Sequence, residues 1–205
     1  AGERGSPDTW RDPRGFSLPE AQVRGFDAGT QWLLHAAREA MRSAGMLDAS
    51  AGGLRAGGLR VGAIIGNLSF PTDALARWTE RHWLGAQESA FLRERGADLA
   101  GVEKPDALQR FSSGMPAMLL ARALGLTPDA GAFALDAACA SSLYAIKLAC
   151  DKLHDRRADV MLAGAVCGSD DLFIHVGFTA LQALSKTGQS RPFHRDADGL
   201  LPAEG

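Results

Sequence analysis

Three short apolar runs alternate with helix-like segments, and this alternation limits the fold more than any other feature of the chain. The runs are VGAIIG (61–66), AFALDAA (132–138) and ADVMLAGAV (158–166). Runs of this kind are typical of strands buried on both faces of a sheet. The apolar spacing and the helix start and stop signals predict helices over 27–46, 111–126 and 139–153. Strand and helix then alternate as in βαβ units, which predicts an α/β fold with a parallel sheet covered by helices.

The remaining segments are less regular. Residues 1–26 are rich in Gly, Pro and charge, and we expect an extended segment that leads into the fold. Residues 72–110 are mixed and polar, with helix expected in pieces. The tail, 185–205, is loop-like.

Composition excludes several classes of function. The 205 residues carry a net charge of -2, without a basic stripe, so nucleic acid and an anionic membrane surface are not expected as partners. Apolar stretches stay below the roughly 18 residues that a membrane span needs. The three cysteines, Cys139, Cys150 and Cys167, are odd in number and form no CxxC pattern. We therefore expect neither a disulfide framework nor a metal site, but reduced thiols in a cytosolic protein.

The stretch LDAACASSLYAIKLACDKL (135–153) places Cys139 between the end of a predicted strand and the start of a helix. Reactive groups of βαβ folds gather at such strand ends. A helix N-terminus favours thiolate over thiol, and a backbone N–H there can stabilise an oxyanion. The small neighbours of Cys139 allow a sharp turn, similar to the nucleophile elbow of hydrolases. On spacing alone, a small core residue is an equal alternative for Cys139.

The other two cysteines lack this small-residue turn, and we expect both to serve packing. Further along the cysteine helix, we expect an inward face made of Leu143, Ile146, Cys150 and Leu153.

The motif DAACASSL (136–143) resembles the active-site motif of the β-ketoacyl synthases (ketosynthases), commonly DTACSSSL in modular polyketide synthases. RVGAIIGN resembles a family strand, PAMLLARALGL the helix at the family's dimer face, and ADVMLAGAV the strand after the cysteine helix. GFTALQALSKTGQSRPFHRDADGLLPAEG resembles the family's RPFD-containing segment. The resemblance covers nearly all of 27–205. DAACASSL together with DGLLPAEG favours iterative polyketide or polyunsaturated-fatty-acid-type synthases.

The resemblance implies a thiolase-like, αβαβα-layered fold, with 27–205 as its first, incomplete half. It implies acyl transfer from the phosphopantetheine of an acyl carrier protein to Cys139, then decarboxylative Claisen condensation with a malonyl-carrier thioester. No cofactor would be bound directly. The implied partners are the carrier protein, its acyl and malonyl thioesters, a second copy in a homodimer and neighbouring synthase modules.

Three further residues follow from the matched motifs. Phe178 stands where the family has an aromatic residue beside the acyl pocket, and we expect it to bind substrate; a core phenylalanine in a loop is an equal alternative. Asp136 and Ser141 are expected to stabilise the turn by hydrogen bonds, because a carboxylate serving the thiol directly would oppose thiolate formation. Ala137 replaces the family's usual Thr, a change other members tolerate.

The largest departure is that two histidines and a lysine of the family's second half have no counterpart among these residues. The histidines present are His35, His82, His154, His175 and His194. None matches those motifs, and we assign none a catalytic role. The isolated chain is expected to lack condensation activity and to expose the face on which the other half packs.

Two alternatives to a condensing enzyme remain at this stage. One is a truncated, non-catalytic half-domain that binds carrier protein or a partner subunit. The other is a thiolase- or chalcone-type enzyme that uses coenzyme A thioesters. The segment RPFHRDADG favours ketosynthases over that second alternative.

Overall fold

The computed structural model describes residues 12–47, 54, 57–69, 72–84, 104, 115–167 and 172–202. The chain divides into two compact units, Ala1–Ala165 and Val166–Gly205.

The first unit is built on a parallel sheet of three strands in the order β2-β1-β3. The strands are β1 (Val61–Gly66), β2 (Ala132–Leu135) and β3 (Val160–Ala165). Ala63 pairs with both Ala132 and Leu162, so β1 lies in the middle. All six residues of β1 are buried, as expected for a continuous apolar run. The α/β class, the parallel sheet and the three strands are confirmed, although β2 ends three residues before the predicted boundary.

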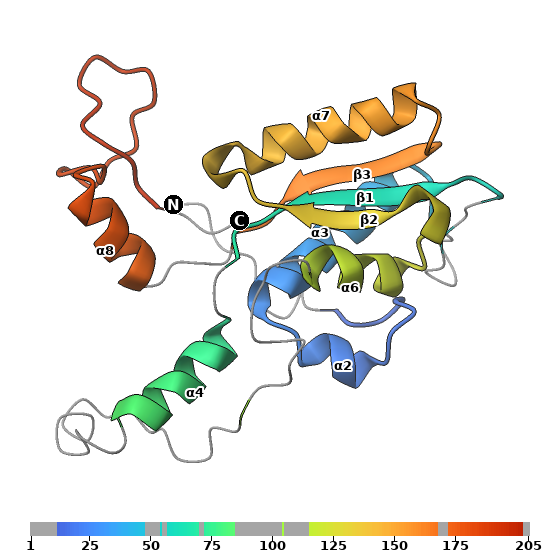
Figure 1. The fold of residues 1–205 in the computed structure, drawn as a ribbon, viewed down its shortest axis with the longest axis horizontal. Coiled ribbons are helices and arrows are strands. Elements are labelled where there is room, and N and C mark those ends of the chain that lie inside the picture. Colours follow the sequence, from blue (N-terminus) through green and yellow to red (C-terminus); the bar gives the residue numbers. More distant parts are fainter. Residues whose placement is uncertain are drawn as a thin grey trace. The chain divides into compact units, whose positions relative to one another are not determined.

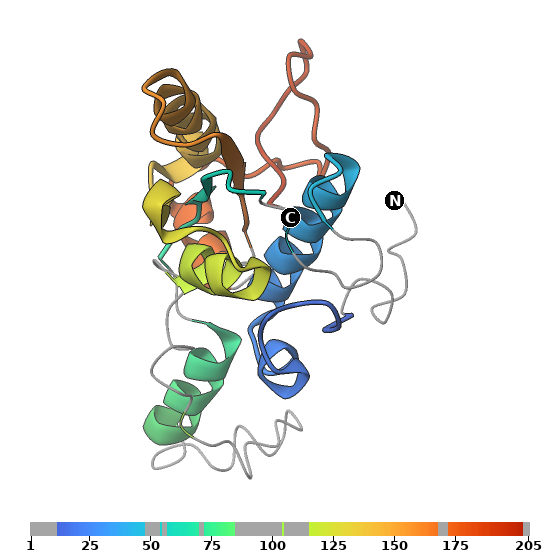
Figure 2. The same cartoon turned by 90° about the vertical axis from the view of Figure 1, so that its right-hand side faces the viewer.

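Helices cover both faces of this sheet (Figure 1). Figure 1 shows α7 (Ser141–His154) along one face and α3 (Ala28–Ser43) and α6 (Met115–Leu124) on the other. Figure 2, turned by 90°, shows α3 and α6 side by side. The predicted helices over 27–46 and 111–126 are thus confirmed in their cores, and residues 111–114 of the second prediction lie outside the described residues.

Two further helices lie among the described residues of this unit. Helix α4 (Asp73–Leu84) lies in the region where helical pieces were expected. Helix α2 (Glu20–Arg24) lies within 1–26, so the expectation of an extended segment is wrong for these five residues. Val23 on α2 and the following Phe26 are both buried, which explains why this stretch folds onto the domain.

The face of α7 that packs on the sheet is not the one expected from its large apolar residues. The inner face of α7 consists of small residues, which are the buried Ser141, Ala145 and Ala149. Ala145 and Ala149 form a cluster with Ile64 of β1. The outer face of α7, defined here as Leu143, Ile146, Cys150 and Leu153, is exposed. The predicted inward face is therefore wrong in direction: the periodicity is real, but the close approach of helix and sheet selects the small side chains.

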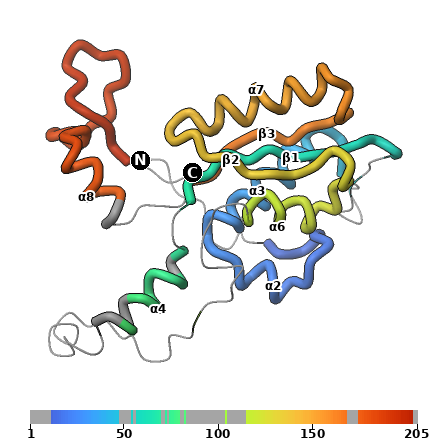
Figure 3. The backbone as a smooth tube through the Cα atoms, in the orientation of Figure 1, coloured from blue at the N-terminus to red at the C-terminus, as the bar shows by residue number. Residues whose placement is uncertain are grey.

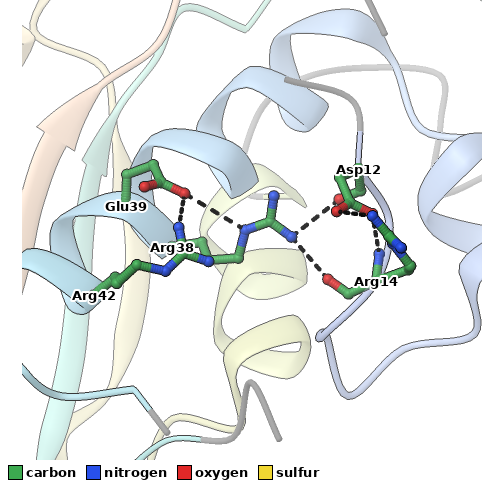
Figure 4. Close-up of polar contacts among 5 residues, drawn as sticks. All are labelled: Asp12, Arg14, Arg38, Glu39 and Arg42. Atoms are coloured by element: carbon green, nitrogen blue, oxygen red, sulfur yellow. Dashed lines mark hydrogen bonds and ion pairs between the residues drawn. The ribbon is translucent and has the colours of Figure 1, made fainter. Parts of the chain in front are cut away.

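A buried arginine fixes the chain before α2 to helix α3 (Figure 4). The Arg38 side chain is only 7% exposed, and its Nη1 donates to the backbone oxygens of Asp12 (3.1 Å) and Arg14 (2.7 Å). Its guanidinium also lies over the Phe16 ring, 4.8 Å from the centroid. Burial lowers the pKa of Arg38, and the negative charge of Asp12 opposes part of this shift. Arg38 thus binds backbone carbonyls from a segment 24 to 26 residues away.

A second charged contact joins the starts of β1 and β3. Arg60 donates to both carboxylate oxygens of Asp159, from Nε (3.0 Å) and Nη2 (3.0 Å), and its backbone N–H adds a bond of 2.8 Å. These side-chain bonds, followed by the backbone bond, lower the pKa of Asp159 to about 2.

The second unit contains helix α8 (Leu172–Ala180) and a loop. The helix was not predicted, and the alternative that made Phe178 a core residue of a loop is wrong about the loop, because Phe178 lies within α8. The part of the tail from 185 to 202 is loop-like, as expected. In it, Asp198 accepts hydrogen bonds from Ser185 Oγ (2.7 Å) and Thr187 N (3.0 Å). Within the described part of the chain, no helix has the length and apolarity needed to cross a membrane.

Candidate active site

Cys139 lies in a tight turn between β2 and α7, which Figure 3 traces as a smooth tube. β2 ends at Leu135, a single 3₁₀ turn covers Ala138–Ala140, and the α-helix begins at Ser141. The helix therefore starts two residues later than expected, because the 3₁₀ turn comes first. Cys139 sits in the middle of that turn and is exposed.

Two side chains hold this turn together. Ser141 Oγ accepts a hydrogen bond from Ala137 N (2.9 Å) and donates one to Ala138 O (2.7 Å). Asp136 Oδ1 accepts from Ala138 N (2.9 Å). The hydrogen-bonding roles expected for Asp136 and Ser141 are thus present, and the Asp136 carboxylate is directed to the backbone N–H of the turn.

Ala138 adopts a left-handed backbone conformation with φ of 50°. For a residue with a Cβ this conformation costs about 1–2 kcal/mol. The sharp reversal places Cys139 at the exposed tip between strand and helix, the feature shared with a nucleophile elbow. Sequence reasoning missed this conformation, and alanine gives no signal for it, because it is not a residue favoured at positive φ.

The start of α7 offers polar groups near the cysteine. Ala140 is the N-cap residue and makes no side-chain cap hydrogen bond. The first N–H groups of an α-helix have no partner within the helix, and the helix dipole adds positive potential there. The Ser141 N–H already donates to Ala138 O in the 3₁₀ turn, so an anion at this position would face the N–H groups further along the first turn of α7.

The turn lies at the carboxyl edge of the sheet, as expected from its place after a predicted strand. Gly66 ends β1 and pairs with Leu135 of β2 and Ala165 of β3. The next residue, Asn67, donates its backbone N–H to Leu135 O (3.0 Å). The strand ends and the start of α7 therefore meet at one edge.

The other candidate residues belong to several elements of the chain. Phe178 is half-buried on α8 in the second unit, and its contact with an acyl chain stays a prediction. His154 is the last residue of α7, so the helix rise places it roughly 20 Å from the Cys139 turn. His35 lies on α3 and is half-buried. Cys150, expected to pack, is exposed on the outer face of α7, and Cys167 is half-buried.

Comparison with known proteins agrees with the motif at this turn. One component of the polyunsaturated fatty acid synthase of Thraustochytrium sp. is 35% identical over 97% of this chain and 9% of that protein. A mycocerosic acid synthase-like polyketide synthase of Mycolicibacterium smegmatis is 31% identical over 95% of this chain and 8% of that protein. The chain thus spans less than a tenth of the length of these two curated relatives.

Solved structures show the same fold. The oxazolomycin ketosynthase domain of Streptomyces albus superposes with a TM-score of 0.68 at 23% identity, over 94% of this chain and 30% of that one. A β-ketoacyl synthase from Burkholderia phymatum gives a TM-score of 0.63 at 20% identity, over 95% of this chain and 42% of that one. At these identities the likeness establishes the fold alone: this chain has the thiolase-like α/β fold over part of the length of these domains.

The sequence model of the family described as "Beta-ketoacyl synthase, N-terminal domain" matches residues 8–205. The expected resemblance to the ketosynthases is therefore confirmed, and the chain belongs to the β-ketoacyl synthase family.

Proposed function

We propose that Cys139 is the acyl-accepting nucleophile of a condensing enzyme. The observation that carries this proposal is the exposed thiol in the strained turn between β2 and α7, within the motif DAACASSL of a family member. A cysteine thiolate is a good nucleophile, and the thioester it forms stays reactive for the next step.

The reaction has two steps. The Cys139 thiolate attacks the thioester of an acyl group on a carrier protein, a new sulfur–acyl bond forms, and the carrier thiolate leaves and takes up a proton. A malonyl-carrier thioester then loses carbon dioxide, and its carbanion attacks the acyl-cysteine and releases the Cys139 thiolate. The turn contributes to both steps, because N–H groups near the start of α7 stabilise negative charge on the thioester oxygen.

The further parts of the proposal follow from family membership. Residues 27–205 form the first half of the condensing domain, preceded by the segment 1–26. Two histidines and a lysine from the remainder of the domain activate the malonyl group, so the isolated 205-residue chain does not condense acyl chains. Substrates arrive on the phosphopantetheine of an acyl carrier protein and no cofactor binds directly. The domain works as a homodimer among neighbouring synthase modules, in the cytoplasm, where thiols remain reduced.

Phe178 is proposed to contact the acyl chain. Replacing it by Ala is expected to change which acyl chain lengths load onto Cys139, without abolishing loading itself. Acyl loading measured across a series of chain lengths checks this; an unchanged chain-length profile contradicts a pocket role and favours plain packing of Phe178 on α8.

The test of the central proposal uses the natural full-length protein and an acyl group carried on phosphopantetheine. Peptide mass spectrometry measures acylation at Cys139 in the wild type, in Cys139→Ala and in Cys150→Ala. Cys150 is the control, because it is a second cysteine close in sequence, on the helix that follows the turn and not in the turn itself. Acylation is expected at Cys139 in the wild type and in Cys150→Ala. Condensed product formed by Cys139→Ala at the wild-type rate contradicts the proposal. Absence of acylation in the wild type favours a non-catalytic domain that only docks carrier protein.

A further inference from the structure

The last residue of the central strand, Gly66, lies directly against the start of α7. A Cβ built on Gly66 would lie 2.7 Å from the carbonyl carbon of Ser141 and 2.7 Å from its Cβ. It would lie 2.9 Å from the backbone carbonyl oxygen of Ser141. Ordinary contacts of a Cβ begin near 3.4 Å. Only a residue without a side chain therefore allows the helix to begin this close to the strand.

Ser141 also holds the turn from the other side. Its side-chain oxygen bonds Ala137 N and Ala138 O, from the two residues that precede Cys139. Ser141 is only 5% exposed, so water does not compete freely for these bonds. The backbone of Ser141 packs against Gly66, and its hydroxyl group holds the strained turn by hydrogen bonds. A continuous set of contacts therefore connects β1 with Ala138, the residue before the nucleophile.

We propose that Gly66 and Ser141 form a positioning pair that sets the place of the Cys139 thiol relative to the start of α7. The inference rests on the proposed function, for which it names residues that act through the nucleophile without touching substrate. With alanine at position 66, the distance from its Cβ to the nearest Ser141 carbon must increase from 2.7 Å to about 3.4 Å. Ser141 is thereby displaced by about 0.7 Å. Because a misplacement of 1 Å can cost about 100-fold in rate, this displacement predicts a loss of roughly 20-fold in acyl transfer.

Two other glycines of the same sheet provide matched controls. At Gly62, at the opposite end of β1, an added Cβ would lie 2.6 Å from Gly131 O and 2.9 Å from Met161 Sδ. Alanine at this site introduces a comparable clash, far from the turn. At Gly164 on β3, an added Cβ meets nothing within 4 Å. The three positions separate the effect of a clash from the effect of its location.

The experiment compares Gly66→Ala, Gly62→Ala and Gly164→Ala in the natural full-length protein. Peptide mass spectrometry gives the iodoacetamide alkylation rate of Cys139 relative to that of a small thiol added to the same sample, and a thermal melt reports stability. In Gly66→Ala the ratio is expected to fall about two- to fivefold, since the thiolate loses its favourable position at the helix start. In Gly62→Ala the melting temperature falls while the ratio stays at the wild-type value. Gly164→Ala changes neither.

Ser141→Ala keeps the test decisive if Gly66→Ala does not fold, because it removes both hydrogen bonds of the Ser141 hydroxyl to the turn without adding volume. It is expected to lower the same ratio. Unchanged ratios in Ser141→Ala and in any folded Gly66→Ala overturn the positioning role, and so does an equal fall in Gly62→Ala. Alkylation needs no acyl substrate, so this result does not depend on whether the protein condenses acyl chains. Acyl loading of the wild type, measured in parallel, tests the proposed function separately.

Discussion

The outer face of α7 is expected to drive self-association of the isolated chain. Its large aliphatic side chains, Leu143, Ile146 and Leu153, are 69%, 50% and 39% exposed, although the opposite face of the same helix is already packed on the sheet. A helix that is apolar on both faces is usually buried on both. We predict that the remainder of the condensing domain covers this face in the full-length protein, and that copies of the isolated chain cover it for one another.

The size of the effect follows from the exposed fractions. Complete burial of an aliphatic side chain contributes about 1.5–3 kcal/mol. Scaled by their exposure, Leu143, Ile146 and Leu153 together contribute about 2–5 kcal/mol when the outer face is covered. Leu143 alone accounts for about 1–2 kcal/mol, so Leu143→Lys is expected to weaken self-association about tenfold for each contact it makes.

Sedimentation velocity over a concentration series measures this association for the isolated chain. Leu59→Lys is the matched control, because Leu59 is an exposed apolar residue (40%) just before β1, outside α7 and outside the α6 helix that resembles the family's dimer face, and the substitution adds the same charge. Leu143→Lys is expected to shift the association to higher concentration, whereas Leu59→Lys leaves it near the wild-type value. In the full-length protein, Leu143→Lys is instead expected to lower the stability of the condensing domain.

Two results would refute this reasoning. An isolated chain that stays monomeric at every concentration and melts cooperatively would show that the outer face needs no cover. Equal effects of Leu143→Lys and Leu59→Lys would show that added charge, and not this face, controls association.

Three further predictions concern the frame around the site. Arg38→Lys is expected to lower the free energy of unfolding by about 1–3 kcal/mol in chemical denaturation, because an ammonium lacks the planar guanidinium that spans two backbone carbonyls over the Phe16 ring; an unchanged midpoint contradicts this. The pKa of Asp159 is depressed to about 2, so its stabilising contribution is complete above about pH 4 and is lost as the pH falls toward 2; Asp159→Asn should flatten the dependence of unfolding on pH in that window and leave the dependence above pH 5 unchanged. Ala138→Gly is expected to raise the melting temperature by a few degrees, since glycine adopts a φ of 50° with little cost, and a lower melting temperature would show that the turn is not strained.

The sequence predicted the strands best where the apolar character of a segment agrees with its burial in the fold. VGAIIG is apolar throughout because β1 is the central strand, buried by its neighbours and by helices on both faces. Helix α3 begins at the expected place, where the Asp27 side chain accepts a hydrogen bond from Gly29 N (3.1 Å). The position of Cys139 between strand and helix was also predictable, since small residues on both sides mark a tight turn.

Other features depend on contacts that periodicity does not encode. α7 has apolar residues on two faces, and hydrophobicity alone favours the larger side chains, although the small face is the one on the sheet. α8 was missed because its run LFIHVGFTA is largely apolar, without the alternation of polar and apolar residues that marks a surface helix. The buried Arg38 is recognisable only once its carbonyl partners, distant in sequence, are in place.

The arrangement of α7 explains why the fold and the site depend on each other. The inner face has small side chains, so the helix approaches the sheet closely enough for Ser141 to rest on Gly66. A larger residue on that face, such as leucine in place of Ala145, would lift the helix from the sheet and carry its first turn with it. The apolar outer face, in turn, holds α7 against the sheet only when the remainder of the domain or another copy of the chain covers it. The position of Cys139 is therefore set by packing on both sides of one 14-residue helix, and the hydrogen bonds of Ser141 transmit that position to the turn.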